Sequence, residues 1–376
     1  MRIGIISVND KATNLLARGG TEVFSANLAY QLAKLGHEVF LFGSADSKVD
    51  GVKIIPTTDE SLWEMEHACS GKGNQVKNIF QIRNVMIAKM YENQIDIFHD
   101  NMSCEIGLSM HGIFTKPVIS SLHMPIDGVF CNSKLSKYLY SPENVYAVAS
   151  KFQQSNLPHG IRSEFIPNGI DVNLFQKDGI KNNTEDLIWI GRINPASPKG
   201  LDDAAYTANR TKKRLRYVGL IENDLYFQNN IKPLMNENII EQSHFSSYSE
   251  KIAFYRSGKA LINPIKWEEP FGLTFIEAMS TGTPIISYAL GAAPEIIEDG
   301  KTGLLVNLSE EQSRGDWIIK RCGVEGLCDA VQYIYKMKDS EYMSMRYACA
   351  EHAKEKYNIE RMVQRYESLY RKVLYM

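Results

Sequence analysis

Two series of short branched-aliphatic runs, each alternating with helical stripes of apolar residues, limit the fold of this chain more than any other feature. The first series opens with the run Ile3–Val8, which is typical of a strand buried in a parallel sheet. A polar loop follows, then apolar residues at helical spacing between Val23 and Leu35, and then a second run at Glu38–Phe42. Strand, helix and strand within the first 42 residues predict the start of an α/β domain.

The same alternation continues along the chain and later begins again. Further strands are predicted at residues 96–99, 116–123, 128–130, 144–149 and 165–171 and, after a polar linker at 177–186, at 187–190, 215–219, 259–263, 283–287 and 303–306. Helices are predicted at 201–209, at 273–280 and from Val324 onward, and Tyr347–Tyr375 is interpreted as one amphipathic helix that packs across both domains. The pattern predicts two doubly wound halves with a cleft between them. Ligands of such sheets bind at the carboxyl ends of the strands.

Composition and charge exclude several classes of protein. The chain has 376 residues, of which 44% are hydrophobic and 23% charged, so it is not a disordered chain, a collagen or a small disulfide-stapled scaffold. The formal net charge of −2 argues against capture of nucleic acid by the molecule as a whole. We interpret the basic run Arg210–Arg216 as a solvated helix end, so no nucleic-acid partner is expected.

Cysteine spacing and the absence of long apolar stretches predict a cytoplasmic location. The six cysteines contain no Cys-x-x-Cys pair, so we expect free thiols in a reducing compartment and no zinc ribbon. The apolar run at the N-terminus is too short for a signal peptide. No stretch reaches 18 uninterrupted apolar residues, so no transmembrane helix is predicted. Peripheral contact with a membrane stays open.

The segment between Asn263 and Pro284 carries the strongest chemical signal. Glu269 and Glu277 lie eight positions apart, and Gly272 favours a turn between them, after which a helix begins near Thr274. The free N–H groups at the start of that helix favour an anion. One turn further on, the carboxylate of Glu277 could accept hydrogen bonds from two vicinal hydroxyl groups. The spacing predicts a diphosphate at the helix start, a ribose at Glu277 and a sugar at Glu269, or else an ordinary loop–helix junction.

This segment resembles the E-x7-E region of the retaining glycosyltransferases of family 4, which have the two-domain GT-B fold. Other segments resemble that family in the expected order; they are 18–22 (RGGTE), 35–39 (LGHEV), His123, 167–171 (PNGID) with Phe175, Gly191-Arg192, Lys199-Gly200 and 291–306. The resemblance covers nearly the whole chain. The segment WEEPFGL at 267–273 is similar to the corresponding segment of small family members associated with natural-product or antibiotic sugar transfer.

The resemblance implies an α/β protein built from two facing Rossmann-like domains with a cleft between them. Residues 1–167, completed by a C-terminal helix at 359–376 that crosses back, would form the acceptor-side domain, and residues 168–358 would form the nucleotide-sugar domain. Catalytic roles are expected for His123, Arg192, Lys199 and Glu269. Nucleotide-sugar contacts are expected from Gly19, Gly20, Phe271, Gly272, Leu273, Thr274 and Glu277.

Two features depart from the family pattern. Six residues separate Arg192 from Lys199, slightly more than in the commoner family loop, which leaves open whether Lys199 reaches the phosphates. Residues 59–75 match nothing in the family. Such loops of the N-terminal domain face the acceptor in this family, so the acceptor cannot be identified.

Arg192 and Lys199 have a physical rationale of their own. Breaking the bond between the sugar and the nucleotide leaves negative charge on the diphosphate, which two fixed cations and a helix N-terminus stabilise. Such an arrangement can substitute for a metal ion, and the sequence has no Asp-x-Asp motif. We therefore expect no metal site and no cofactor. The alternative is that Gly191-Arg192 is a surface turn.

The N-terminal half contributes two further candidates. Gly19 and Gly20 let backbone amides approach a ligand closely and form an anion nest at the start of a helix, although a Gly-Gly pair can also be a simple turn. The resemblance implies that His123 contacts the donor sugar, whereas a lone histidine near a strand is often a satisfied core residue. His99 also ends a strand and could belong to either class.

Together these features predict a metal-independent retaining glycosyltransferase. It would move a sugar from a nucleoside diphosphate sugar to a hydroxyl group of an acceptor that the sequence does not identify. The resemblance implies front-side attack, with the leaving phosphate helping to deprotonate the acceptor, and no side chain is assigned as a general base. The alternatives are a non-catalytic nucleotide- or sugar-binding relative and an epimerase or phosphorylase with the same fold.

Overall fold

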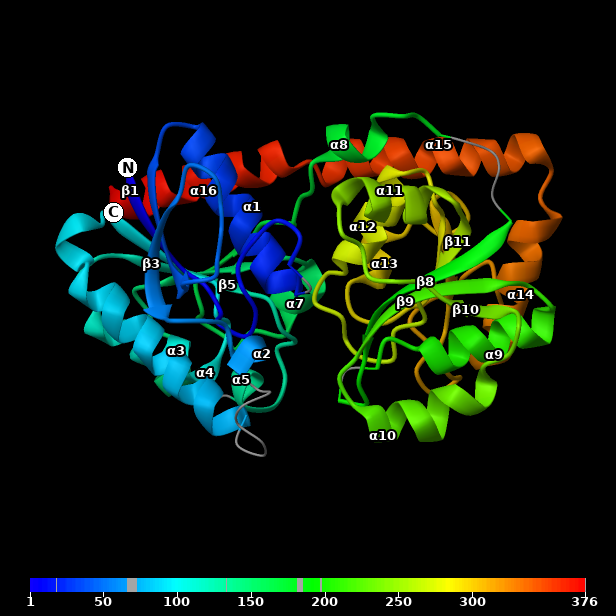
Figure 1. The fold of residues 1–376 in the computed structure, drawn as a ribbon, viewed down its shortest axis with the longest axis horizontal. Helices are drawn as coiled ribbons and strands as arrows, with labels where there is room; N and C mark the ends of the chain where they lie inside the picture. Colours follow the sequence, from blue (N-terminus) through cyan, green and yellow to red (C-terminus); the bar gives the residue numbers. More distant parts are fainter. Residues whose placement is uncertain (18, 66–72, 133, 181–184, 197, 376) are drawn as a thin grey trace. The chain divides into compact units, whose positions relative to one another are not determined.

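The structure of the protein is a computed structural model that describes residues 1–376 except Arg18, 66–72, Ser133, 181–184, Ser197 and Met376. The chain divides into two compact units (Figure 1). Unit 1 comprises Met1–Gly169 and Ile359–Met376, and unit 2 comprises Ile170–Asn358. The predicted α/β fold is confirmed, because each unit is built on its own parallel sheet.

Unit 1 contains a seven-stranded sheet in which every pair of neighbours is parallel. Its strands are β1 (Arg2–Ile6), β2 (Glu38–Ser44), β3 (Lys53–Thr58), β4 (Ile97–Asp100), β5 (Val118–Leu122), β6 (Val145–Val148) and β7 (Ser163–Phe165). They lie in the order β3-β2-β1-β4-β5-β6-β7. The order reverses between β1 and β4, which is the crevice where sheets of this type bind ligands.

Helices cover both faces of this sheet (Figure 1). The helices of unit 1 are α1 (Gly20–Lys34), α2 (Leu62–Met65), α3 (Gly73–Met90), α4 (Glu105–Met110), α5 (Gly128–Cys131), α6 (Ser136–Leu139), α7 (Lys151–Ser155) and α16 (Ile359–Leu374), with short 3-10 turns at Glu92–Gln94 and His111–Ile113. Ile3 and Ile5 pack in one apolar cluster with α1 and α16. Ile6 and Phe98 pack in another cluster with α3. The alternation of side chains along a strand produces this two-sided core.

Unit 2 repeats the design with six parallel strands. Its strands are β8 (Asp186–Ile193), β9 (Leu215–Ile221), β10 (Ile239–Glu241), β11 (Gly258–Ile262), β12 (Ile285–Tyr288) and β13 (Gly303–Val306). They lie in the order β10-β9-β8-β11-β12-β13, so the order reverses between β8 and β11. The carboxyl ends of β8 and β11 are therefore the expected binding edge of this unit.

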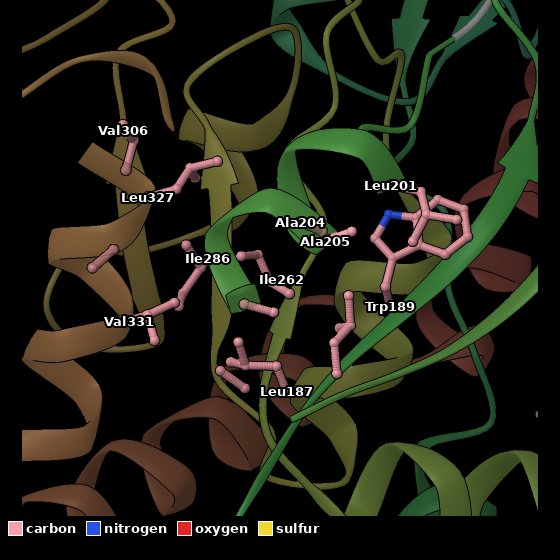
Figure 2. Packing of buried hydrophobic residues seen from close by; sticks show 14 of the residues in the cluster. Leu187, Trp189, Leu201, Ala204, Ala205, Ile262, Ile286, Val306, Leu327 and Val331 are labelled. Carbon is pink, nitrogen blue, oxygen red and sulfur yellow. The ribbon is translucent and has the colours of Figure 1, made fainter. Parts of the chain in front are cut away.

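The helices of unit 2 hold this edge in place. They are α8 (Val172–Gln176), α9 (Leu201–Thr211), α10 (Asp224–Tyr226), α11 (Tyr248–Arg256), α12 (Leu273–Ser280), α13 (Ala293–Ile296), α14 (Gly323–Lys336) and α15 (Asp339–Lys356), with short helical turns at Phe227–Ile231 and Lys232–Leu234. Figure 2 shows the core in which Trp189 of β8 packs near Leu201 of α9, while Leu327 and Val331 of α14 cover Ile286.

Several predicted elements need correction. Residues 128–130 form the start of helix α5 and not a strand. In the segment 165–171, predicted as a strand that runs into a turn, only Phe165 belongs to strand β7, which begins at Ser163. The single C-terminal helix predicted over Tyr347–Tyr375 is two helices, because α15 ends at Lys356 in unit 2 and α16 begins at Ile359 in unit 1. Strands β3 and β10 and helices α3 and α11 were not predicted.

Three sequence features outside the site have simple structural outcomes. The basic run ends in two arginines, Arg214 and Arg216, which both pair with Asp186 at 2.7 and 2.8 Å. Cys104, Cys131, Cys322, Cys328 and Cys349 are free thiols, and Cys69 lies outside the described residues. Among the helices that the structure describes, none is both long and apolar enough to cross a membrane.

Candidate active site

Helix α12 follows β11 through a loop that only glycine can complete. Gly272 caps the helix with a φ of +99°, a left-handed conformation that L residues with a Cβ rarely adopt. A Cβ at this position would also lie 2.6 Å from the ring of Phe275. The predicted contacts Gly272, Leu273 and Thr274 thus form the first turn of α12, where backbone N–H groups lack partners within the helix. The ring of Phe271 is buried and packs edge-on against Tyr357, and its contact with a nucleotide sugar stays a prediction.

Glu269 lies just before this turn and is held through its backbone. The N–H of Ala292 donates to the carbonyl oxygen of Glu269 at 2.9 Å. Gly291 has a φ of +56°, and a Cβ there would lie 2.4 Å from the backbone of Glu269. The loop after β12 therefore fixes the position of Glu269. Its carboxylate forms an ion pair with the ammonium group of Lys199, and both side chains are mostly buried.

The loop after β8 brings Lys199 back beside that strand. The indole N–H of Trp189 donates to the carbonyl oxygen of Lys199 at 3.1 Å, and Lys199 lies over the ring of Trp267, 4.8 Å from its centroid. Gly200 has a φ of +75°, and a Cβ there would collide with the carbonyl oxygen of Pro264. The extra length of this loop, of which Ser197 lies outside the described residues, thus leaves Lys199 beside Glu269.

Arg192 belongs to strand β8 itself and not to the loop. Its guanidinium group lies 3.6 Å from the carboxylate of Glu222, and the side chain is 42% exposed. The structure therefore brings Lys199 together with Glu269, and Arg192 together with Glu222. A shared role of Arg192 and Lys199 toward one diphosphate stays a prediction.

Glu277 is buried one turn inside α12 and has two side-chain partners. The ammonium group of Lys251 donates to its Oε1 at 2.5 Å, and the hydroxyl of Tyr255 donates to its Oε2 at 2.8 Å. Burial and the neighbouring carboxylate raise the pKa of Tyr255 well above its ordinary value, so its hydroxyl stays a donor. Sequence reasoning missed both partners. Their i, i+4 spacing on a helix was the available signal.

In unit 1, the predicted glycine nest is lined by a side chain of the same helix. Gly19 caps α1 in an extended conformation, and the carboxylate of Glu22 lies where a Cβ of Gly19 would be. Glu22 is buried, and this burial raises the pKa of its carboxyl group. Gly19 is therefore needed to make room for Glu22. Contact of Gly19 and Gly20 with a ligand stays a prediction, and Arg18 lies outside the described residues.

His123 follows β5 and points to polar groups at the carboxyl edge of the sheet. Its backbone N–H donates to the hydroxyl of Ser103 at 2.8 Å, and its Nε2 lies 3.3 Å from Oδ1 of Asn101. The ring packs edge-on against Phe24, with 4.5 Å between the ring centroids. Burial lowers the pKa of His123 to about 4, so the imidazole is neutral near pH 7 and acts as a hydrogen-bonding group.

His99 is a satisfied core residue. Its ring nitrogens lie 2.6 Å from the hydroxyl of Tyr370 and 2.7 Å from that of Ser121. Burial lowers its pKa to about 3. A second buried pair, His111 with Asp100 at 2.8 Å, was not predicted from the sequence. Within the described residues, no group of three or more His, Cys, Asp or Glu side chains is arranged to hold a metal ion.

Comparisons with known proteins identify the family. Residues 18–174 match the family described as glycosyltransferase family 4, and residues 171–320 match the glycosyl transferases group 1. The two matches together span 18–320, which includes every predicted site residue. The chain belongs to glycosyltransferase family 4.

Individual relatives agree with this assignment. The glycosyltransferase is 23% identical to the D-inositol 3-phosphate glycosyltransferase of Corynebacterium aurimucosum, over 94% of this chain and 92% of that protein. Two solved structures share its GT-B fold at similarities that show the fold alone. Sucrose-phosphate synthase from Thermosynechococcus elongatus has a TM-score of 0.75 at 17% identity and covers 99% of both chains. HepE of Anabaena in complex with UDP-glucose has a TM-score of 0.71 at 16% identity and covers 98% of this chain and 99% of its own. The likeness to antibiotic-type members stays a prediction.

Proposed function

We propose that this glycosyltransferase uses a nucleoside diphosphate sugar as donor, keeps the anomeric configuration and needs no metal ion. The observation that carries the proposal is the arrangement at the carboxyl edge of the unit 2 sheet. There the first turn of α12, the Lys199–Glu269 pair and the buried Glu277 all come from loops and helices that follow β8 and β11. HepE, which shares this fold, was solved with UDP-glucose.

Each part of this edge suits one part of such a donor. The N–H groups at the start of α12 and the ammonium group of Lys199 favour the diphosphate, on which negative charge grows as the glycosidic bond breaks. The carboxylate of Glu277 suits the hydroxyl groups of a ribose. Glu269, fixed through its backbone, is left to contact the sugar and to hold Lys199 until the donor binds.

The residues of unit 1 are assigned to the transferred sugar. His123 is neutral near pH 7 and can exchange hydrogen bonds with a sugar hydroxyl. The acceptor hydroxyl would attack on the side from which the diphosphate leaves, and a phosphate oxygen would take its proton. No side chain is assigned as a general base.

Binding of nucleoside diphosphates tests the donor class. UDP, GDP, ADP, TDP and CDP are compared by thermal shift, since a ligand that binds only the folded state raises stability by RT ln(1 + [L]/Kd). We expect one diphosphate to raise the melting temperature clearly more than the others and more than its monophosphate. No shift with any of the five would contradict the donor proposal.

The stereochemical outcome tests the retaining mechanism. With the sugar nucleotide of the preferred base, the first-formed product is examined by NMR for its anomeric configuration. Retention supports the proposal, and inversion overturns it. Transfer with no absorbance from a bound pyridoxal group argues against a phosphorylase, while binding without transfer from any donor would favour a non-catalytic relative.

A further inference from the structure

We propose that Lys251 and Tyr255 position the carboxylate of Glu277 and thereby make the enzyme discriminate donors that contain ribose from donors that contain deoxyribose. The inference rests on the proposed function, which assigns Glu277 to the ribose. Lys251 and Tyr255 are positioning residues, since they act through Glu277.

Helix α11 presents both donors to one carboxylate. Lys251 and Tyr255 lie one turn apart, so their side chains share a face of the helix. Lys251 reaches Oε1 of Glu277 at 2.5 Å, and Tyr255 reaches Oε2 at 2.8 Å. A carboxylate held at both oxygens cannot rotate about its last bond. Its plane is therefore fixed before any ligand arrives.

The contacts with Lys251 and Tyr255 use about half of the hydrogen-bond acceptor positions of the Glu277 carboxylate. An ionised carboxylate offers about four acceptor positions, two on each oxygen. Among the residues that the structure describes, Lys251 and Tyr255 occupy one position on each oxygen, which leaves one position on each. Two neighbouring acceptor positions in one plane match the two vicinal hydroxyl groups of a ribose. A 2′-deoxyribose can fill only one of them and leaves the other acceptor buried without a partner, which costs free energy.

The charge of Lys251 offsets the cost of burying this carboxylate. The side chain of Glu277 is only 6% exposed, and a buried charge without a partner is costly. The ammonium group of Lys251, itself 19% exposed, supplies that partner and fixes Oε1 of Glu277.

Helix α11 is anchored so that the two donors stay in place. At its start, the side chain of Ser247 accepts from the N–H of Glu250 at 3.2 Å. Near its end, the hydroxyl of Thr283 donates to the carbonyl oxygen of Tyr255 at 2.7 Å, and Arg256 pairs with Asp178 at 2.8 Å. Support of this kind keeps a recognition group within a few tenths of an ångström of its working geometry.

The test compares two ligands on the full chain by calorimetry. The probes are the ribonucleoside diphosphate preferred in the thermal-shift panel and its 2′-deoxy analogue. A panel in which TDP, whose sugar is deoxyribose, binds best overturns the proposal. We expect the wild-type enzyme to prefer the ribose form about tenfold to a hundredfold. Lys251→Met should bring this preference to within about threefold while affinity for the deoxy analogue changes little. Lys251→Arg, which keeps a charge, should retain part of the preference. Tyr255→Phe, which removes one of the two donors that orient the carboxylate, should lower the preference about fivefold.

A second lysine–tyrosine pair in the same unit provides the matched control. Lys259 lies over the ring of Tyr342 at 3.5 Å, and the hydroxyl of Tyr342 donates to the carbonyl oxygen of Lys259 at 2.7 Å. Lys259→Met and Tyr342→Phe should keep the wild-type preference, even where they lower the melting temperature. A thermal melt of every variant separates loss of fold from loss of recognition.

The outcomes separate the positioning role of Lys251 and Tyr255 from the assignment of Glu277 to the ribose. An unchanged preference in Lys251→Met, or an equal loss of affinity for both ligands, overturns the positioning role. If Lys251→Met does not fold, the preference measured for Tyr255→Phe decides, and a wild-type value overturns the proposal. A preference that survives in Glu277→Ala contradicts instead the ribose assignment within the proposed function.

Discussion

The ammonium group of Lys199 has different partners before and during the proposed reaction. Before donor binding it is paired with Glu269. As the glycosidic bond breaks, the growing charge on the diphosphate competes for it, so Lys199 should act more on turnover than on donor affinity. The pair also means that replacing Lys199 alone leaves a carboxylate that is 12% exposed without its cation.

Lys199→Ala and Arg192→Ala should each lower kcat by about 10²–10³, equivalent to roughly 2.7–4 kcal/mol, with a modest change in donor KM. The double variant should lose less than the product of the two if, as we propose, both cations act on one leaving group. Arg192→Lys should not fully restore turnover, since a fork of donors becomes a point charge. Steady-state kinetics with the verified donor measure these effects.

The control for these variants is Lys232→Ala, which removes an exposed lysine of the same unit and should keep wild-type turnover. Near-normal turnover of Lys199→Ala would contradict the leaving-group role of Lys199. That role would then rest on Arg192 and the first turn of α12.

His99 makes the stability of the enzyme depend on pH. Its pKa is about 3 in the folded state and about 6.5 in an unfolded chain, so below pH 6.5 the unfolded state binds a proton that the folded state does not. The stabilisation is complete above pH 6.5 and is lost as the pH falls toward 3. Between pH 7 and pH 5 the free energy of unfolding should fall by about 2 kcal/mol from this group alone. Urea unfolding of wild type and His99→Gln at both pH values measures it, with the exposed His159→Gln as control. An equal pH dependence in His99→Gln and wild type would contradict the assignment.

At the scale of single elements, the start of α12 depends on one backbone conformation. Gly272→Ala places a Cβ in a left-handed conformation, at a cost of about 1–2 kcal/mol, and moves it against the ring of Phe275. The first turn of α12 must shift, so affinity for the preferred nucleoside diphosphate should fall together with the melting temperature. Gly36→Ala is the matched control, because Gly36 has a φ of +84° and nothing within 4 Å of an added Cβ. Gly36→Ala should lower the melting temperature and keep the affinity, and a similar affinity in both variants would contradict the role of this turn.

The helices and strands that could be predicted are those whose own residues carry a clear pattern. Residues 303–306 form β13 with the predicted bounds, because Gly303 opens a continuous apolar run. The helix predicted to start at residues 273–280 is α12, and Gly272 marks its start. The short apolar run at 128–130 fits strand and helix equally well, and its neighbours in unit 1 decide for helix. Strand β3 contains Pro56 and two threonines, and β10 has three residues, so neither stands out from a loop.

The sequence predicts the candidate site as a set of residue types, and the structure adds the contacts among them. The spacing of Glu269 and Glu277 points to the segment. The partner of Glu269 lies 70 positions away in the sequence, and those of Glu277 lie 26 and 22 positions away. Such pairs depend on how strands are ordered in the sheet. Sequence reasoning therefore gave Lys199 and Glu269 separate ligands, whereas the structure pairs them.

At the scale of the whole molecule, the charge of the enzyme is nearly balanced, with 42 basic and 44 acidic residues. Stabilisation of a leaving diphosphate must therefore come from fixed local groups. Arg192, Lys199 and the first turn of α12 are the groups assigned to it, and the sequence offers no Asp-x-Asp motif to hold a metal ion. We expect the rate of sugar transfer to stay within about twofold after exhaustive EDTA treatment, since in our proposal two charge-assisted contacts and a helix N-terminus would stabilise a charge of this size. Added Mg²⁺ or Mn²⁺ should not raise the rate of the treated enzyme. A rate that collapses with the chelator and returns with either ion would show that the cations of unit 2 do not suffice.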